Sequence, residues 1–136
     1  AGAVIAGKTA DIIDGDGTSL AAGATMVVLD IAAATVLTQT ATVLNYTAAT
    51  VSNAAALETA LEAGGGLLTT EATTGVTAAD SMLAMYDNGT NIVLAMVEFT
   101  ATVAAGTAIA AVDVTDIATL TGVTTDLVAG DFALIA

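Results

Sequence analysis

The segment at residues 81–103, SMLAMYDNGTNIVLAMVEFTATV, restricts the fold of this chain more than any other. Its Asp-Asn-Gly at 87–89 consists of residues that tolerate positive φ, as a tight β-hairpin turn requires. The flanks, residues 81–86 and 91–99, are predicted strands with apolar side chains on both faces. A strand that is wet on one face alternates apolar with polar residues instead. We therefore predict a hairpin covered on both faces, by a helix on one side and by a second sheet or another subunit on the other.

Most of the remaining chain also has the apolar, β-branched composition of strands, interrupted by Gly, Asp and Thr. The sequence therefore predicts a mainly β, β-sandwich-like fold with one short α-helix near residues 53–63. The further predicted strands lie at residues 3–6, at 24–31, in one or two pieces of 34–51, at 108–112 and at 116–121, and residues 69–80 are predicted to form a polar connection.

The helix is predicted from the segment SNAAALETALEA at residues 52–63. Ser52 or Asn53 can cap its N-terminus, because their side-chain oxygens can accept the unpaired amide hydrogens of the first turn. Leu57 and Leu61 are four residues apart and share one face, and the two glutamates beside them are predicted to be solvated. The glycines at 64–66 are predicted to end the helix.

The charge balance excludes several classes of partner. Fourteen acidic residues accompany one basic residue, Lys8, and the formal net charge is −13. Binding of nucleic acid requires Lys and Arg to displace counterions, and anionic membranes attract basic segments, so neither is an expected partner. The most apolar region, residues 20–37, contains Asp30 and many β-branched residues, and is therefore expected to form strands rather than to insert in a membrane.

The low density of charge is the main indication of function. Only 11% of the residues are charged, compared with about 25% in an ordinary soluble domain. A soluble monomer usually carries a denser mixture of surface charges. Two explanations remain open: identical copies bury much of this surface, or the chain is a Thr-rich extracellular β domain.

Acidic pairs supply the candidate metal ligands. Asp14 and Asp16 are two residues apart in a glycine-rich turn, so both carboxylates can face one Ca²⁺ ion, with Asp11 completing the oxygen shell. The pattern departs from an EF-hand loop, and the alternative is a solvated turn. Asp113 with Asp116 is a further candidate, as is the pair at residues 126 and 131, each with a strand-end turn as the alternative.

No catalytic residues or cofactor other than calcium are predicted. The chain has no His or Cys, which removes the usual base for a serine nucleophile, the main zinc ligands and any cysteine nucleophile. Carboxylate pairs could support glycoside chemistry, but the chain has only four aromatic residues, which are expected in the core. We therefore expect the protein not to be an enzyme.

Residues 53–136 resemble the C-terminal region of calcium-dependent bacterial proteins exported by type I secretion, of the RTX and surface-layer types. The order of features carries the resemblance: the Ala-rich helix NAAALETALEA, the hairpin MYDNGTNIVLAM and the ending DIATLTGVTTDLVAGDFALIA. The chain departs from the family because the calcium-binding nonapeptide GGxGxDxUx is absent. The resemblance implies a secreted or cell-surface location and no particular activity.

Together these features predict a single β-rich domain over residues 1–136, with residues 1–7 as a strand-exchange arm that pairs with the sheet edge of a neighbour. The expected function is that of a structural, self-assembling extracellular subunit of a filament or surface layer, stabilised by calcium. The alternatives are a calcium-binding C-terminal folding and export module of a larger secreted protein, and an adhesin domain.

Overall fold

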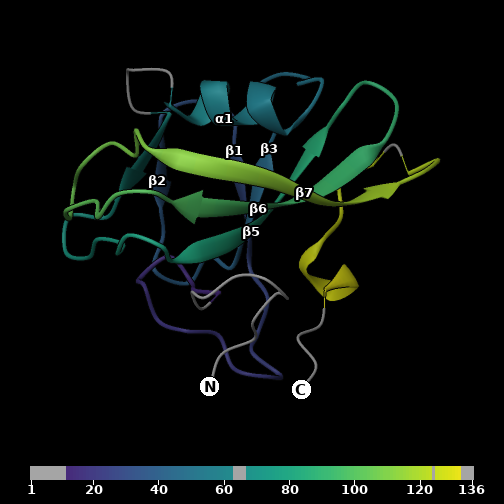
Figure 1. Cartoon of the computed structure of the whole chain (residues 1–136). Helices are drawn as coiled ribbons and strands as arrows, with labels where there is room; N and C mark the ends of the chain where they lie inside the picture. Colours follow the sequence, from purple (N-terminus) through teal and green to yellow (C-terminus); the bar gives the residue numbers. More distant parts are fainter. Residues whose placement is uncertain (1–11, 63–66, 124, 133–136) are drawn as a thin grey trace.

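The computed structural model describes residues 12–62, 67–123 and 125–132, and Figure 1 shows their arrangement. In this part of the chain the fold is mainly β and sandwich-like, with a five-stranded and a two-stranded sheet and one short α-helix, as predicted. The elements are β1 (Val28–Ile31), β2 (Thr35–Leu37), β3 (Val43–Tyr46), α1 (Ala54–Glu62), β4 (Leu68–Thr70), β5 (Ser81–Asp87), β6 (Ile92–Phe99), β7 (Val112–Leu120) and the 3₁₀ turn η1 (Ala129–Asp131). The predicted strand at 3–6, the arm at 1–7 and the glycines at 64–66 lie outside the described residues.

The larger sheet has the order β1-β3-β5-β6-β7. Its first three strands are parallel, and β5, β6 and β7 are antiparallel. The predicted hairpin is confirmed as β5 and β6, with Met82 opposite Val97. In its turn Gly89 has a φ of 89°, and Asn88 Oδ1 accepts hydrogen bonds from the backbone amides of Thr90 and Asn91 at 3.0 and 2.9 Å. Of the three residues only Gly89 has a positive φ, so Asp87 and Asn88 contribute to the turn through their side-chain oxygens instead.

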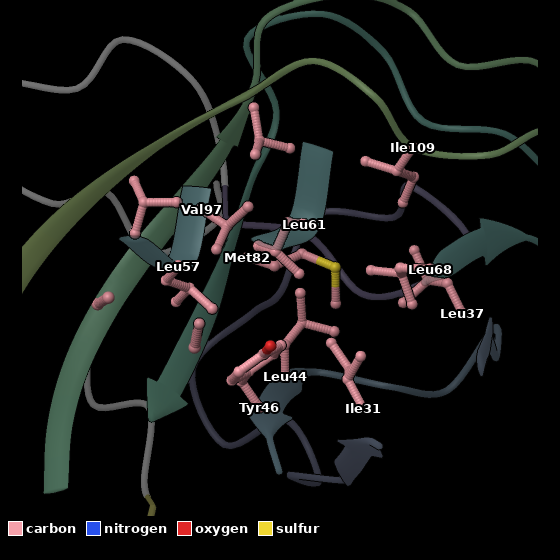
Figure 2. Close-up of a cluster of buried hydrophobic side chains, with 14 of the residues drawn as sticks. Ile31, Leu37, Leu44, Tyr46, Leu57, Leu61, Leu68, Met82, Val97 and Ile109 are labelled. Carbon is pink, nitrogen blue, oxygen red and sulfur yellow. The ribbon is translucent and has the colours of Figure 1, made fainter. Parts of the chain in front are cut away.

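Both faces of the hairpin are covered, and both covers come from this chain. On one face, side chains such as Met82 and Val97 join a core with the α1 residues Leu57 and Leu61 and with the small β2–β4 sheet (Figure 2). On the other face, a smaller cluster joins Met96 to side chains of the segment that precedes β1. Figure 1 shows α1 on one side of the sheet and this early segment on the opposite side. The helix provides the predicted cover, whereas the second cover is a loop segment.

The helix α1 begins and packs as predicted, except for its glutamates. The side chain of Asn53 accepts a hydrogen bond from the amide of Ala56 at 3.0 Å, which caps the first turn. The expectation that the glutamates are solvated was wrong. Glu58 and Glu62 are half-buried and accept hydrogen bonds from backbone amides of β7 at 3.2 and 2.9 Å. These two side chains therefore close part of a sheet edge.

The last strand differs from its prediction as two separate strands. Residues 112–120 form one continuous strand, β7, and residues 108–111 precede it as a loop. The predicted gap at residues 113–115 is paired regularly with β6, and the strand is irregular only further on, at a β-bulge in which Ile117 is the extra residue between the two pairs Ala95–Asp116 and Leu94–Ala118. An edge strand tolerates acidic residues because much of it faces water.

Candidate functional site

The predicted acidic loop forms a tight turn in which the carboxylates bind backbone amides. Asp14 Oδ1 accepts hydrogen bonds from the amides of Thr18 at 2.9 Å and Asp16 at 3.2 Å. Asp16 Oδ1 accepts a second bond from Thr18 at 3.0 Å. Gly17 has a φ of 81°, which glycine adopts without strain. Asp11, the third predicted ligand, lies outside the described residues.

The structure brings the carboxyl groups of Asp14 and Asp16 into contact. Burial raises the pKa of Asp14, and its hydrogen bond with the Asp16 carboxyl raises that pKa further. The same hydrogen bond lowers the pKa of Asp16. Two adjacent carboxyl groups either share a proton or repel each other, and a divalent cation would relieve that repulsion. Calcium binding at this loop stays a prediction.

The structure does not bring Asp113 and Asp116 together. They are three residues apart on β7, and side chains at odd spacing along a strand point to opposite faces. Asp116 accepts a hydrogen bond at 2.9 Å from the hydroxyl of the buried Tyr86, whereas Asp113 lies opposite Glu98 in the sheet register. A cation at either residue would therefore need other ligands.

The two acidic residues near the C-terminus also have different surroundings. Asp131 accepts a hydrogen bond from the amide of Val128 at 2.9 Å, which closes the short 3₁₀ turn. Asp126 instead reaches the sheet and lines two cavities, of about 460 and 310 Å³. Asp30 and Asn45 also line the larger cavity, so oxygen-bearing side chains from three segments of the chain border it.

Asn45 lies at the centre of this group of side chains. Its Nδ2 donates hydrogen bonds to Asp30 Oδ1 at 2.7 Å and to Asp126 Oδ2 at 3.0 Å. Asn45 is only 3% exposed, and its Oδ1 is buried without a hydrogen-bond partner. Two exposed carboxylates thus converge on one buried amide whose own acceptor is unsatisfied.

The sequence did not identify this group as a site. Asp30 and Asn45 become neighbours only because β1 and β3 pair in parallel with these two residues in register. Asp126 follows Asn45 by 81 positions and approaches from the loop after β7. A parallel pairing of the two strands, had it been recognised, would have placed an acid beside an amide at the same strand end.

The group around Asn45 lines an oxygen-rich cavity. Among the described residues, no three His, Cys, Asp or Glu side chains are grouped so as to hold a metal ion. The group around Asn45 has two carboxylates, so its third protein oxygen would have to come from the amide. Hard cations such as Ca²⁺ accept both kinds of oxygen.

Comparison with known proteins gives no match: no family model fits the chain, and neither a curated protein nor a solved structure is significantly similar to it. None of the helices in the described part of the chain has the length and apolar character needed to span a membrane.

Proposed function

We propose that this chain is a structural, self-associating extracellular subunit of a filament or surface layer, and that copies meet through an uncharged face formed by two paired loops. These paired loops are residues 72–79, between β4 and β5, and residues 100–108, between β6 and β7. Neither of these two segments contains a charged residue, and the carboxylates nearest to them in sequence, Glu71 and Asp80, flank the first segment. This uncharged face is the observation that supports the proposal best.

The paired loops hold each other in place through backbone hydrogen bonds. Val76 and Val103 exchange two bonds, of 3.0 and 2.9 Å. The hydroxyl of Thr70 donates to the carbonyl of Ala104 at 2.7 Å and accepts from the amide of Thr107 at 3.1 Å. A face that is already ordered loses less conformational entropy when it binds.

The exposed residues of the paired loops are small and neutral. They are Ala72, Thr73, Thr77, Ala78, Ala79, Thr100, Ala101, Thr102, Ala104, Ala105, Gly106, Thr107 and Ala108. Two copies that each carry a net charge of −13 repel each other over most of their surface. Contact centred on residues 100–108 requires less charge to be desolvated than contact elsewhere, and it keeps like charges of the two copies further apart.

Charge substitution on the paired loops tests the proposal. We expect the wild-type chain to form particles much larger than 13.1 kDa at micromolar concentration, in sedimentation velocity and electron microscopy. Ala101→Glu with Ala105→Glu should shift the population to monomer, and the corresponding Lys variants show whether local desolvation or total charge matters. Ala33→Glu with Ala55→Glu, at two exposed positions outside the paired loops, is the matched control because it adds the same charge. A wild-type chain that stays monomeric in every salt and calcium condition would overturn the proposal.

The arm at residues 1–7 offers a second mode of association that the same experiments can separate. If the arm adds a strand to a neighbouring sheet, its deletion should leave a folded monomer, because polymer growth then depends on main-chain pairing. If the paired loops carry the contact, the deletion should leave polymers intact and the Glu variants should dissolve them.

A calcium-binding folding and export module is the second candidate function, favoured by the contact between the Asp14 and Asp16 carboxyl groups. This reading predicts a monomer whose melting temperature rises steeply with calcium and falls with chelator. The resemblance of residues 53–136 to type I-secreted proteins supports an extracellular location in both readings.

A further inference from the structure

We propose that the open half of β7, residues 116–120, accepts residues 3–6 of a neighbouring copy as an added antiparallel strand. The inference rests on the proposed function, because it adds a second contact between the same copies and names the two surfaces that meet. In strand addition, main-chain hydrogen bonds give the affinity and side-chain contacts give the specificity. The arm at residues 1–7 lies outside the described residues, whereas its acceptor edge lies within them.

The outer edge of β7 is closed along its first half only. β7 is the last strand of the five-stranded sheet, so no strand of that sheet lies on its outer side. The amides of Val112 and Val114 donate to the two glutamates of α1. Further along, every residue from Thr115 to Thr119 is exposed. The open half spans about 16 Å, which an extended segment of four or five residues matches.

The sheet register indicates which backbone groups of the open half point outward. Val114 directs its amide to α1, away from its partner Val97 on β6. In an antiparallel pair, every second residue directs its backbone groups away from the neighbouring strand in this way. Counted in steps of two along β6 from Val97, the next partners on β7 are Asp116 and Thr119. The amides and carbonyls of these two residues therefore face the side on which an added strand would pair.

The other strand edges of the described sheets are less suited to such an addition. β1, at the opposite edge of the large sheet, has four residues, of which only Asp30 is exposed. Residues 126–129 border a cavity beside this strand and restrict access to it. The strands β2 and β4 of the small sheet have three residues each. Among these strands, β7 therefore offers the longest exposed run.

The charge of the arm fits the open half of β7. Residues 1–7, AGAVIAG, contain no charged side chain, and they are followed by Lys8, the only Lys or Arg of the chain. Asp113 and Asp116 are exposed on β7, so this edge attracts a base and disfavours acidic segments. An antiparallel strand with Val4 opposite Thr119 places Lys8 beside these two carboxylates. A parallel strand would place Lys8 beyond the end of β7, so the charges favour the antiparallel direction.

The side chains and the symmetry of the contact agree with assembly into a polymer. Ile117, in the middle of the open half, is 44% exposed and offers an apolar surface to the apolar side chains of the arm. The contact joins the arm of one copy to the sheet edge of the next. Such a heterologous contact does not close on itself, so it propagates from copy to copy.

Disulfide cross-linking of the full chain tests the inference, since the chain has no cysteine of its own. Val4→Cys and Thr119→Cys are made in two separate chains, which are mixed and oxidised mildly. We expect a covalent heterodimer. Val4→Cys with Ala55→Cys, at an exposed position on α1, should give roughly tenfold less product, because a disulfide requires Cα atoms within about 7 Å. Lys8→Glu in the arm-bearing chain should lower the yield severalfold, and Lys8→Arg should preserve it.

The outcomes separate this inference from the proposed function. Large particles that Ala101→Glu with Ala105→Glu dissolves, without a disulfide between arm and edge, would overturn the inference alone. So would a doubly substituted chain that closes on itself while the mixture gives no heterodimer, because the arm then covers its own edge. A monomeric wild type overturns the proposed function, and the yield of heterodimer then decides by itself whether the arm recognises the edge.

Discussion

Glu58 Oε2 accepts a hydrogen bond at 3.2 Å from the backbone amide of Val114, across the outer edge of β7. One helical turn later, Glu62 Oε1 accepts one from Val112 at 2.9 Å. Four residues of helix rise about 6 Å, and two residues of strand span about 6.6 Å, so the glutamates match alternate amides of the strand. Two side chains of the helix therefore bind amides at the edge of the sheet that could otherwise pair with another strand.

Replacing both glutamates by alanine should destabilise the protein and bare this edge. Because the amides of Val112 and Val114 would lose charged acceptors in a half-buried setting, we expect a loss of about 1–2 kcal/mol for each substitution, measured by urea denaturation. The uncovered edge should also promote aggregation, which an increase in light scattering would reveal. Glu58→Gln with Glu62→Gln keeps an acceptor oxygen and should lose less; alanine variants with wild-type stability would show that the two bonds contribute little.

The hairpin and the helix could be predicted because local signals define them. An Asp-Asn-Gly turn between two apolar runs and a capped leucine stripe, Leu57 with Leu61, need no knowledge of distant residues. Edge pairing was not predictable in the same way. The role of Glu58 depends on β7 lying beside α1, and a helical wheel alone places that glutamate in water.

The group around Asn45 could not be predicted for a related reason. It requires the parallel register of β1 with β3, and parallel pairing joins strands through long connections that leave no local pattern. The acidic pair Asp113 and Asp116 shows the opposite error. Proximity in sequence suggested a shared ligand set, but the strand alternation directs the two carboxylates to opposite faces.

Gly15 should be intolerant of any side chain. Its backbone amide donates to the carbonyl of Ala41 at 2.8 Å, and a Cβ at this position would overlap the carbonyl oxygen of Thr38. Backbone atoms cannot move aside as flexible side chains do, so Gly15→Ala should cost about 1–3 kcal/mol in urea denaturation. Gly130→Ala is the control, since a Cβ there meets no atom within 4 Å. Equal stability of the two variants would contradict this packing.

Leu57 should be the residue through which α1 contributes most to the core. It is 1% exposed and packs in the cluster that covers the hairpin (Figure 2). Leu57→Ala should reduce the free energy of unfolding by about 2–5 kcal/mol, because it removes buried methyl groups and leaves a cavity. Leu57→Met keeps the volume and should cost less than about 1.5 kcal/mol. An alanine variant as stable as the methionine variant would indicate that the helix is loosely packed.

The hydrogen bond between Tyr86 and Asp116 should make stability depend on alkaline pH. Burial, and then the acceptance of this bond by Asp116, raise the pKa of Tyr86 above its ordinary value of 10.0. Below about pH 10 the phenol is protonated in both the folded and the unfolded chain, so it adds no pH dependence. Above that pH the unfolded chain loses the proton first, and stability falls as the pH rises, by at most about 1.4 kcal/mol per pH unit.

Tyr86→Phe separates this titration from the rest of the molecule. At neutral pH the variant should lose about 1 kcal/mol, because Asp116 is exposed and can bind water instead. Between pH 9 and 11 its stability should fall less steeply than that of the wild type, as measured by urea denaturation at each pH. Absorbance at 295 nm should show that one tyrosine of the native wild type ionises at a higher pH than it does in the unfolded chain. Parallel pH profiles for the two proteins would mean that Tyr86 titrates in the folded state as it does in the unfolded chain.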